Sequence, residues 1–446
     1  MFVPGASPSS PSPVEQPLSS ERIVELAQKN DKRVQALREQ LSVLEAKQQE
    51  ARWAWFPKFE TSFSMAGPVP EARNDRLGGP PTTQASYLYD WDWGTLGVAL
   101  RANMSTVLPV YTFGKLSALR EMAAHAVGLG HSLELRAKEE IRLQTLQAYW
   151  GFQVARQAKA SLEEGQKRLE EVERLLQHME KAGSLQVTRA DFFKLKYYKN
   201  LLASRQGEIE AGRQWALAAL EAMAGFAVLP VEEDIPEPEG ELPSVEESTA
   251  LALGARAEVR TLEEGMRLRK AEVRLAQSQF WPDVGVFGFA RWAWASNTTR
   301  QYSPFAYDPF HESSAGLGLT VRMTFDIPQK LARFQQAQGE LRKVQREREA
   351  AQAALKVELS KLLGELKGIQ MRAQSLEASE REARRWAMAS ATAFELGTGE
   401  TRDVFDAYLA WLSVSAEKLK AWSEFQLGLA ALERAVGASW RTTKNF

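Results

Sequence analysis

Apolar and polar residues alternate with a period of two along two stretches of the chain. In residues 96–105 the even-numbered positions are apolar, and in residues 317–327 the odd-numbered positions are apolar. This alternation predicts β-strands that have one apolar and one polar face. Four residues of the intervening positions are expected on the polar face: Arg101, Asn103, Arg322 and Thr324.

A second β-strand is predicted before each of these two. Residues 59–65 follow Pro57 and also alternate, whereas residues 284–295 carry large side chains on both parities, which leaves their faces ambiguous. The four strands predict two hairpins, at about 58–106 and about 283–327.

Long stretches without proline predict unusually long helices. Residues 115–181 and 329–396 each exceed sixty residues, or roughly 100 Å at the rise of an α-helix, which is longer than a globular core. Each ends in a glycine turn before a return helix, and a shorter helix is predicted at 19–55. Apolar residues spaced by three and four predict coiled-coil seams: Leu169, Val172, Leu176 and Met179, and Leu355, Leu359, Leu362, Leu366 and Ile369.

The predicted elements occur twice in the same order. Glu21 aligns with Glu246 and Pro57 with Pro282 without a gap, and each copy reads helix, hairpin, long helix, return helix. This pattern predicts a tandem duplication of one unit. The domains expected from it are a disordered segment 1–17, a first repeat 18–226, an acidic proline-rich linker 227–243 outside both repeats, a second repeat 244–437 and a tail 438–446.

Composition excludes several functions. The 446 residues carry a net charge of −1 with both signs mixed throughout, so no basic face is available for nucleic acid. The chain has no cysteine, and its four histidines lack the spacing of metal ligands. The turn Gly397–Thr401 resembles a phosphate loop but has Glu400 where lysine is required. We therefore expect no enzyme, no metal and no cofactor.

Aromatic residues indicate a membrane location for the strands. No run reaches the roughly 18 apolar residues of a spanning helix, so a membrane-crossing form of this chain would use strands. Tyr and Trp gather at both ends of the strands, as in the aromatic girdles of a transmembrane β-barrel. Those at the strand ends nearest the helices are Trp53, Trp55, Tyr111 and Trp281, with Phe113, and those at the far ends are Tyr87, Tyr89, Trp91, Trp93, Trp292, Trp294, Tyr302 and Tyr307.

Four strands are too few to close a barrel, and open sheet edges in lipid leave backbone groups unpaired. We therefore expect assembly, and three copies would supply twelve strands. The lumen of such a barrel would be faced by Arg101, Asn103, Arg322 and Thr324. Two alternatives remain for the same pattern: the half-buried sheet of a water-soluble protein, and a soluble coiled-coil scaffold whose hairpins mediate assembly. The serine- and proline-rich residues 1–17 lack the features of a signal peptide, so a leader expected for an exported protein is absent from this sequence.

Several motifs in a fixed order resemble the TolC-type outer-membrane efflux proteins. They are an aromatic-proline pair before each hairpin (Phe56-Pro57 and Trp281-Pro282), the stretch Pro109–Lys115, and the stretch Phe394–Ala407. The resemblance covers about Leu18 to Val436. It implies a mainly α-helical trimer with a twelve-stranded barrel in the outer membrane of a Gram-negative bacterium and a coiled helical tunnel in the periplasm.

In function, the resemblance implies a passive exit duct of a tripartite efflux or type I secretion system. Its partners would be a periplasmic adaptor (membrane fusion protein), an inner-membrane pump and outer-membrane lipid. Energy would come from the pump, and the chain itself would carry out no chemical reaction.

The resemblance also implies a gate at the turn before the last helix. Asp403 and Asp406 match the positions of the family's pore constriction, where a ring of aspartates binds cations, and the gating turn falls on Phe394, Gly397, Thr398 and Gly399. Phe394 and Gly399 depart from a Tyr and an Arg that are frequent in this turn, and the first repeat offers only Asp191, near Arg189. The alternative for Asp403 is a carboxylate that stabilises the start of a helix capped by Thr401.

Overall fold

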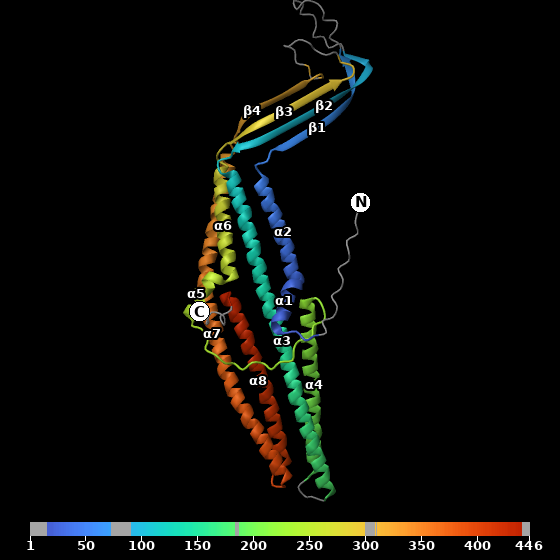
Figure 1. Cartoon of the computed structure of the whole chain (residues 1–446), viewed down its shortest axis with the longest axis vertical. Coiled ribbons are helices and arrows are strands. Elements are labelled where there is room, and N and C mark those ends of the chain that lie inside the picture. Colours follow the sequence, from blue (N-terminus) through green and yellow to red (C-terminus); the bar gives the residue numbers. More distant parts are fainter. Residues whose placement is uncertain (1–15, 73–90, 183–186, 299–307, 309, 439–446) are drawn as a thin grey trace, which may run out of the picture. The chain divides into compact units, whose positions relative to one another are not determined.

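The computed structural model describes residues 16–72, 91–182, 187–298, 308 and 310–438. Its elements come in two series of the same order (Figure 1). The first series is α1 (Ser20–Asn30), α2 (Lys32–Trp53), β1 (Lys58–Ala72), β2 (Trp91–Tyr111), α3 (Lys115–Lys181) and α4 (Arg189–Ala224). The second is α5 (Val245–Ala255), α6 (Ala257–Ser278), β3 (Asp283–Ala295), β4 (Ser313–Arg322), α7 (Ile327–Glu395) and α8 (Thr401–Val436).

Corresponding helices of the two series have nearly the same lengths. The first and second helices have 11 and 22 residues in both series, the long helices have 67 and 69, and the return helices have 36 each. The predicted order of helix, strand pair, long helix and return helix is confirmed.

The helix predicted at 19–55 is broken at Asp31. This residue leaves the helical conformation with ψ of 129°, and its carboxylate accepts a hydrogen bond from the backbone N–H of Arg33 at 2.7 Å, which starts α2. Arg256, with ψ of 132°, makes the same break between α5 and α6. The apolar pattern that predicted the helix at 19–55 continues through Asp31 and does not indicate this break.

By compactness the chain divides into two units. The helical unit comprises Met1–Val43, Gly128–Glu264 and Gln345–Phe446, and the sheet unit comprises Leu44–Val127 and Gly265–Val344. Each unit takes residues from both predicted repeats, so the division by packing cuts across the division by sequence.

The sheet unit contains one sheet of four antiparallel strands in the order β1-β2-β3-β4. β2 of the first series pairs with β3 of the second, with Arg101 opposite Ala293. The two hairpins therefore form one continuous sheet, in which β1 and β4 are the outer strands.

Apolar clusters hold the helical unit together. Leu169, Val172 and Leu176 of α3 are buried against α4 and the start of α8, as the predicted seam requires. The α7 seam packs against the second half of α8, and the residues of this cluster include Leu355, Leu359, Leu363, Leu366, Phe425, Leu429 and Leu432. Both predicted coiled-coil seams thus mark packed helix faces.

The acidic linker is packed rather than separate from the helices. Val228 and Ile235 are buried in the cluster of α1, α3 and α4. Gln153 of α3 donates to the carbonyl of Val231 at 2.6 Å, and the Tyr149 hydroxyl donates to the Glu233 carboxylate at 2.5 Å. The linker continues along the second series, where Gln370 and Gln426 donate to carbonyls of Gly240 and Pro236. The prolines of the linker keep its backbone extended, and side chains of neighbouring helices donate hydrogen bonds to its carbonyl groups.

This packing predicts a loss of stability at alkaline pH. Burial, and next the Glu233 carboxylate, raise the pKa of Tyr149. A tyrosine in the unfolded chain loses its proton near pH 10, so the stabilising effect of the protonated form is complete below that pH and is lost as the pH rises above it. We expect Tyr149→Phe to show a smaller drop in unfolding temperature between about pH 8 and about pH 10.5 than the parent protein.

The matched control is Tyr197→Phe, because Tyr197 lies 61% exposed on α4. Thermal unfolding followed by circular dichroism at both pH values measures the difference. Equal drops in the parent and the Tyr149→Phe protein would contradict the prediction.

Candidate functional site

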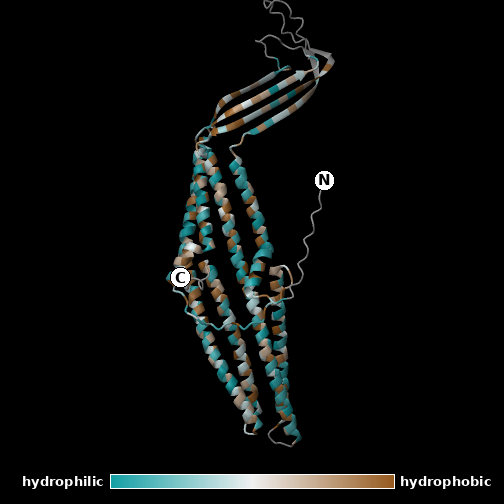
Figure 2. Ribbon diagram, in the orientation of Figure 1, coloured by the Kyte–Doolittle hydropathy of each residue, from teal (hydrophilic) through white to brown (hydrophobic). Residues whose placement is uncertain are grey.

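The strand register separates the sheet into a polar and an apolar face. Residues that are directly opposite in antiparallel strands point to the same side. One row of partners across the sheet is polar and consists of Ser62, Asn103, Arg291 and Ser314. The next row points to the other side and consists of Thr61, Met104, Ala290 and Ala315. Figure 2 shows the resulting alternation of hydropathy along the strands.

The apolar face lies open in the single chain. Leu317, Leu319 and Val321 of β4 are 84%, 78% and 69% exposed, and Phe63 and Met65 of β1 are 70% and 72% exposed. Aliphatic side chains in the core of a water-soluble sheet would be buried. This face therefore requires an apolar environment that the chain does not itself supply.

Three of the four predicted polar residues share the opposite face. Arg101 and Asn103 lie on β2, and Arg322 is the last residue of β4. Thr324 lies beyond β4, in the segment between β4 and α7, where its carbonyl accepts a hydrogen bond from Lys330 at 2.5 Å. β4 is shorter than predicted because α7 already begins at Ile327, where the following Pro328 suits the first turn of a helix.

Phe287 and Phe289 also lie on the polar face, although the sequence pattern of residues 284–295 left their face ambiguous. The rings of Phe287 and Phe289 stack with centroids 6.3 Å apart and an interplanar angle of 13°. They cover Gly318 and Gly316 of β4, where an added Cβ would lie 2.6 Å and 2.8 Å from the rings. The Phe-x-Phe and Gly-x-Gly spacings were the sequence signal, but only the register shows that they are partners.

Aromatic residues gather where the sheet joins its helices. Phe113 stacks on Trp281 at 5.4 Å and contacts Tyr111 edge-on at 4.6 Å. Lys115 ties the same region together by an ion pair with Asp283 at 2.7 Å. At the other end, Trp292 and Trp294 are 44% and 43% exposed. Of the predicted far girdle, Tyr87, Tyr89, Tyr302 and Tyr307 lie outside the described residues, as do the side chains of Trp91 and Trp93.

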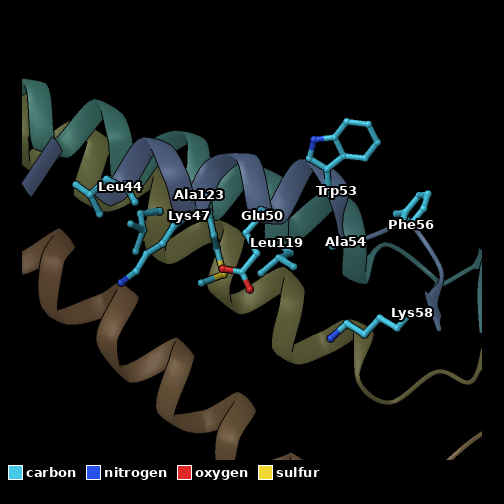
Figure 3. A pocket seen from close by; sticks show the side chains of 13 residues that line it. Leu44, Lys47, Glu50, Trp53, Ala54, Phe56, Lys58, Leu119 and Ala123 are labelled. Atoms are coloured by element: carbon cyan, nitrogen blue, oxygen red, sulfur yellow. The ribbon is translucent and has the colours of Figure 1, made fainter. Parts of the chain in front are cut away.

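The sheet unit has a further hollow between α2, α3 and α6, with a volume of about 1020 Å³ (Figure 3). Its walls are mainly apolar and include Leu44, Leu119, Ala123 and Leu268, with Lys47 and Glu50 beside them. This hollow lacks a group of side chains suited to chemistry or to a specific polar ligand.

The turn between α7 and α8 is tightly built. The backbone N–H groups of Thr398 and Gly399 both donate to the carbonyl of Ala393 at 2.9 Å. Gly397 has φ of +74°, a conformation that favours glycine, and a Cβ at Gly399 would lie 2.9 Å from the backbone nitrogen of Phe394. Phe394 itself is buried with Val404 and Phe405. The four predicted turn residues therefore form one compact structure.

Asp403 and Asp406 lie in the first turns of α8. Their spacing of three places them on neighbouring positions of the helix surface. Asp403 is exposed, whereas Asp406 is partly buried and accepts hydrogen bonds from the Tyr198 hydroxyl at 3.2 Å and from Arg402 Nε at 3.4 Å. Burial, and next the nearby Asp406 carboxylate, raise the pKa of Tyr198, which keeps this hydroxyl a donor.

The expected cap at Thr401 is wrong. Glu400 occupies the N-cap position without a side-chain cap bond, and Thr401 is the first helical residue. At the matching position of α4, Asp191 is buried and forms a capping box with Thr188. Asp403 has the same place in its helix as Asp191, but its carboxylate is not committed to such a box. The two aspartates thus have different surroundings despite the repeated sequence plan.

The part of the chain that the structure describes has neither a cluster of metal ligands nor a membrane-spanning helix. There, no three His, Cys, Asp or Glu side chains gather as metal ligands. No helix in the same part of the chain is long and apolar enough to cross a bilayer.

Part of the chain matches a known protein family. Residues 249–438, which include most of the second series, match the family described as outer membrane efflux protein. This region therefore carries an outer membrane efflux protein domain. The resemblance noted from its sequence motifs is confirmed. A search of curated proteins found no match.

Several solved outer membrane proteins share the fold along nearly the whole chain. The Campylobacter jejuni CmeC outer membrane channel superposes with a TM-score of 0.75 at 14% identity, covering 100% of this chain and 96% of that one. The Neisseria gonorrhoeae MtrE outer membrane channel superposes with a TM-score of 0.73 at 14% identity, covering 94% of this chain and 89% of that one. The outer membrane protein VceC from Vibrio cholerae superposes with a TM-score of 0.72 at 16% identity, covering 94% of this chain and 96% of that one.

These relationships agree with the function predicted from the sequence. Members of the outer membrane efflux protein family are transport channels rather than enzymes. The chain is accordingly an efflux channel protein.

Proposed function

We propose that the chain is the exit duct of a tripartite efflux system in the outer membrane of a Gram-negative bacterium. Three copies form a twelve-stranded barrel in the membrane, and their helices form a tunnel in the periplasm. A periplasmic adaptor and an inner-membrane pump deliver the cargo, which the duct conducts passively. The observation that carries the proposal is the exposed apolar face of the sheet, opposite a face that bears Arg101, Arg322 and Asn103.

The geometry of the sheet supports a closed assembly. Its outer strands, β1 and β4, would leave backbone N–H and C=O groups unpaired in lipid, at several kcal/mol for each group. Pairing β4 of one copy with β1 of the next satisfies these groups. Closure by three copies gives twelve strands, with the polar faces directed toward a water-filled bore.

Solubility and conductance test this proposal directly. We expect the protein to require detergent for extraction, to behave as a trimer in it, and to form ion-conducting pores in planar bilayers. The alternative, a soluble coiled-coil scaffold, predicts a monodisperse protein without detergent and no conductance. That result would overturn the duct.

We also propose that Asp403 and Asp406 form the cation-sensitive constriction of the tunnel. Threefold symmetry would place six carboxylates around one narrow bore, as in acidic rings that select cations. The exposure of Asp403 and its freedom from a capping box support this assignment. Phe394, Gly397, Thr398 and Gly399 would position the ring by shaping the turn before it.

Removing the charge should change permeation. We expect Asp403→Asn combined with Asp406→Asn to lower the selectivity of the channel for cations and to weaken block by divalent cations at least about tenfold, because the attraction of six nearby charges is lost. Planar-bilayer recordings with Mg²⁺ added on the periplasmic side measure both effects.

The matched control is Asp191→Asn, which removes a carboxylate at the same helix position of α4. Since Asp191 is buried in a capping box, its replacement should lower stability and leave divalent block unchanged. If the double variant conducts and is blocked like the parent, Asp403 serves only the helix start.

A further inference from the structure

An aromatic surface lies on the polar face of the sheet. It consists of the stacked rings of Phe287 and Phe289 above Gly316 and Gly318, and is called here the aromatic shelf. Both rings are only partly buried. Large apolar groups are out of place on a face that otherwise carries polar and charged residues, unless they have a contact to make.

Cationic side chains surround the aromatic shelf. The guanidinium of Arg291 lies over the ring of Phe289, with its Cζ 5.0 Å from the ring centroid. Arg291 is 54% exposed at its side chain, and a carboxylate oxygen of Glu312 lies 4.0 Å from its guanidinium. Such a separation leaves the guanidinium available to a second anionic partner.

The shelf and these cations line one open groove of about 660 Å³. Lys58 and Arg322 contribute to the same groove, together with Arg291. Its two carboxylates are those of Glu60 and Asp283, and Asp283 is already paired with Lys115 at 2.7 Å. The groove therefore combines flat apolar surface with an excess of positive charge, and its volume suits a small organic molecule.

We propose that this groove binds organic anions that have a flat aromatic body. The body stacks on Phe287 and Phe289, and its carboxylate or sulfonate meets the guanidinium of Arg291, with Arg322 as a second cation. The proposal rests on the duct proposed above only in placing this groove along the path of the cargo. In the assembled trimer three such grooves would favour anions at the membrane end of the duct.

Paired probes of similar shape and opposite charge test the site. Binding of 1-naphthalenesulfonate to the full-length protein in an uncharged detergent is measured by calorimetry, and block of single-channel current is measured in planar bilayers. A naphthyl trimethylammonium cation is the matched probe. We expect the anion to bind and to block, and the cation to do so at least about tenfold more weakly.

Three variants locate the site. Phe287→Thr combined with Phe289→Thr and, separately, Arg291→Gln should each weaken binding of the anion about tenfold. Arg346→Gln removes an arginine that lies 82% exposed on α7 and should leave binding unchanged. Trimer formation in detergent verifies folding, and the single Arg291 change provides an answer if the double variant does not fold.

The outcomes separate this site from the duct itself. A protein that conducts ions but binds both probes equally, or binds the anion equally in all variants, contradicts the aromatic-shelf site and leaves the duct standing. A protein that binds the anion through Phe287, Phe289 and Arg291 but forms no pore supports the site and contradicts the duct.

Discussion

Replacing Leu319 with arginine is expected to abolish assembly of the protein in the outer membrane. Leu319 lies on β4 with 78% of its surface exposed, on the apolar face opposite Val286. An arginine facing lipid near the bilayer midplane costs about 2 to 4 kcal/mol. The change would occur three times in a trimer. Membrane fractionation followed by electrophoresis of unheated samples measures the loss of trimer.

The adjacent residue provides a matched control. Thr320 lies next to Leu319 on the same strand, but its side chain points to the polar face, opposite Gly285. Thr320→Arg should assemble close to normally because the new charge would meet water in the bore. If both arginine variants assemble equally well, the apolar face of the sheet does not contact lipid.

Truncation of Phe405 is expected to destabilise the helices that carry the proposed constriction. Phe405 is 1% exposed on α8, and its ring centroid lies 4.9 Å from that of Tyr198 on α4. Phe405→Ala should lower stability by about 3 to 5 kcal/mol, because it removes apolar contact and leaves a cavity. The cavity would lie beside Asp406, so the proposed constriction should be less rigid and conductance should fluctuate more.

Phe193→Ala is the control for this truncation, since Phe193 on α4 is 73% exposed in the chain. The same change in side chain should there alter stability by no more than about 0.5 kcal/mol. Thermal unfolding in detergent and local hydrogen exchange of α4 and α8 measure the two effects. Equal stability of the two variants would show that the Phe405 cluster does not hold these helices together.

Periodicity predicted the regular elements because it shows which residues share one face of a helix or strand. A residue spacing of three and four along Leu355, Leu359, Leu362 and Leu366 requires one packed helix face, and these residues are buried or partly buried in one cluster. A spacing of two along Leu317, Leu319 and Val321 requires one face of a strand, and these residues share that face. In both cases the pattern is local, so it can be read without knowing which element is the partner.

Features that depend on a partner could not be read in this way. The acidic linker is held by Tyr149, Gln153 and Gln426, which are distant from it in sequence. Composition predicted only that the linker lies outside both repeats. Its buried Ile235 shows that hydrogen bonds to extended backbone can pack a proline-rich segment against helices.

Some features of the predicted site followed from a local sequence pattern, whereas others depended on a partner element. The polar parity of Arg101, Asn103 and Arg322 followed from alternation alone. The aromatic shelf depended on the register that sets Phe287 against Gly318 and Phe289 against Gly316. Likewise, the different settings of Asp191 and Asp403 depend on whether the N-cap residue forms a box, which their shared position in the repeat does not reveal.

Taken by itself, the sequence determined that this chain has long helices, two-faced strands and a repeated plan, because burial and exposure recur at the spacing of each element. Only the tertiary structure decided that the two hairpins form one sheet, where β4 ends, how the linker packs, and which aromatic and cationic groups meet. These features are set by contacts between residues far apart in the chain, and a local pattern of hydropathy carries no information about such pairs.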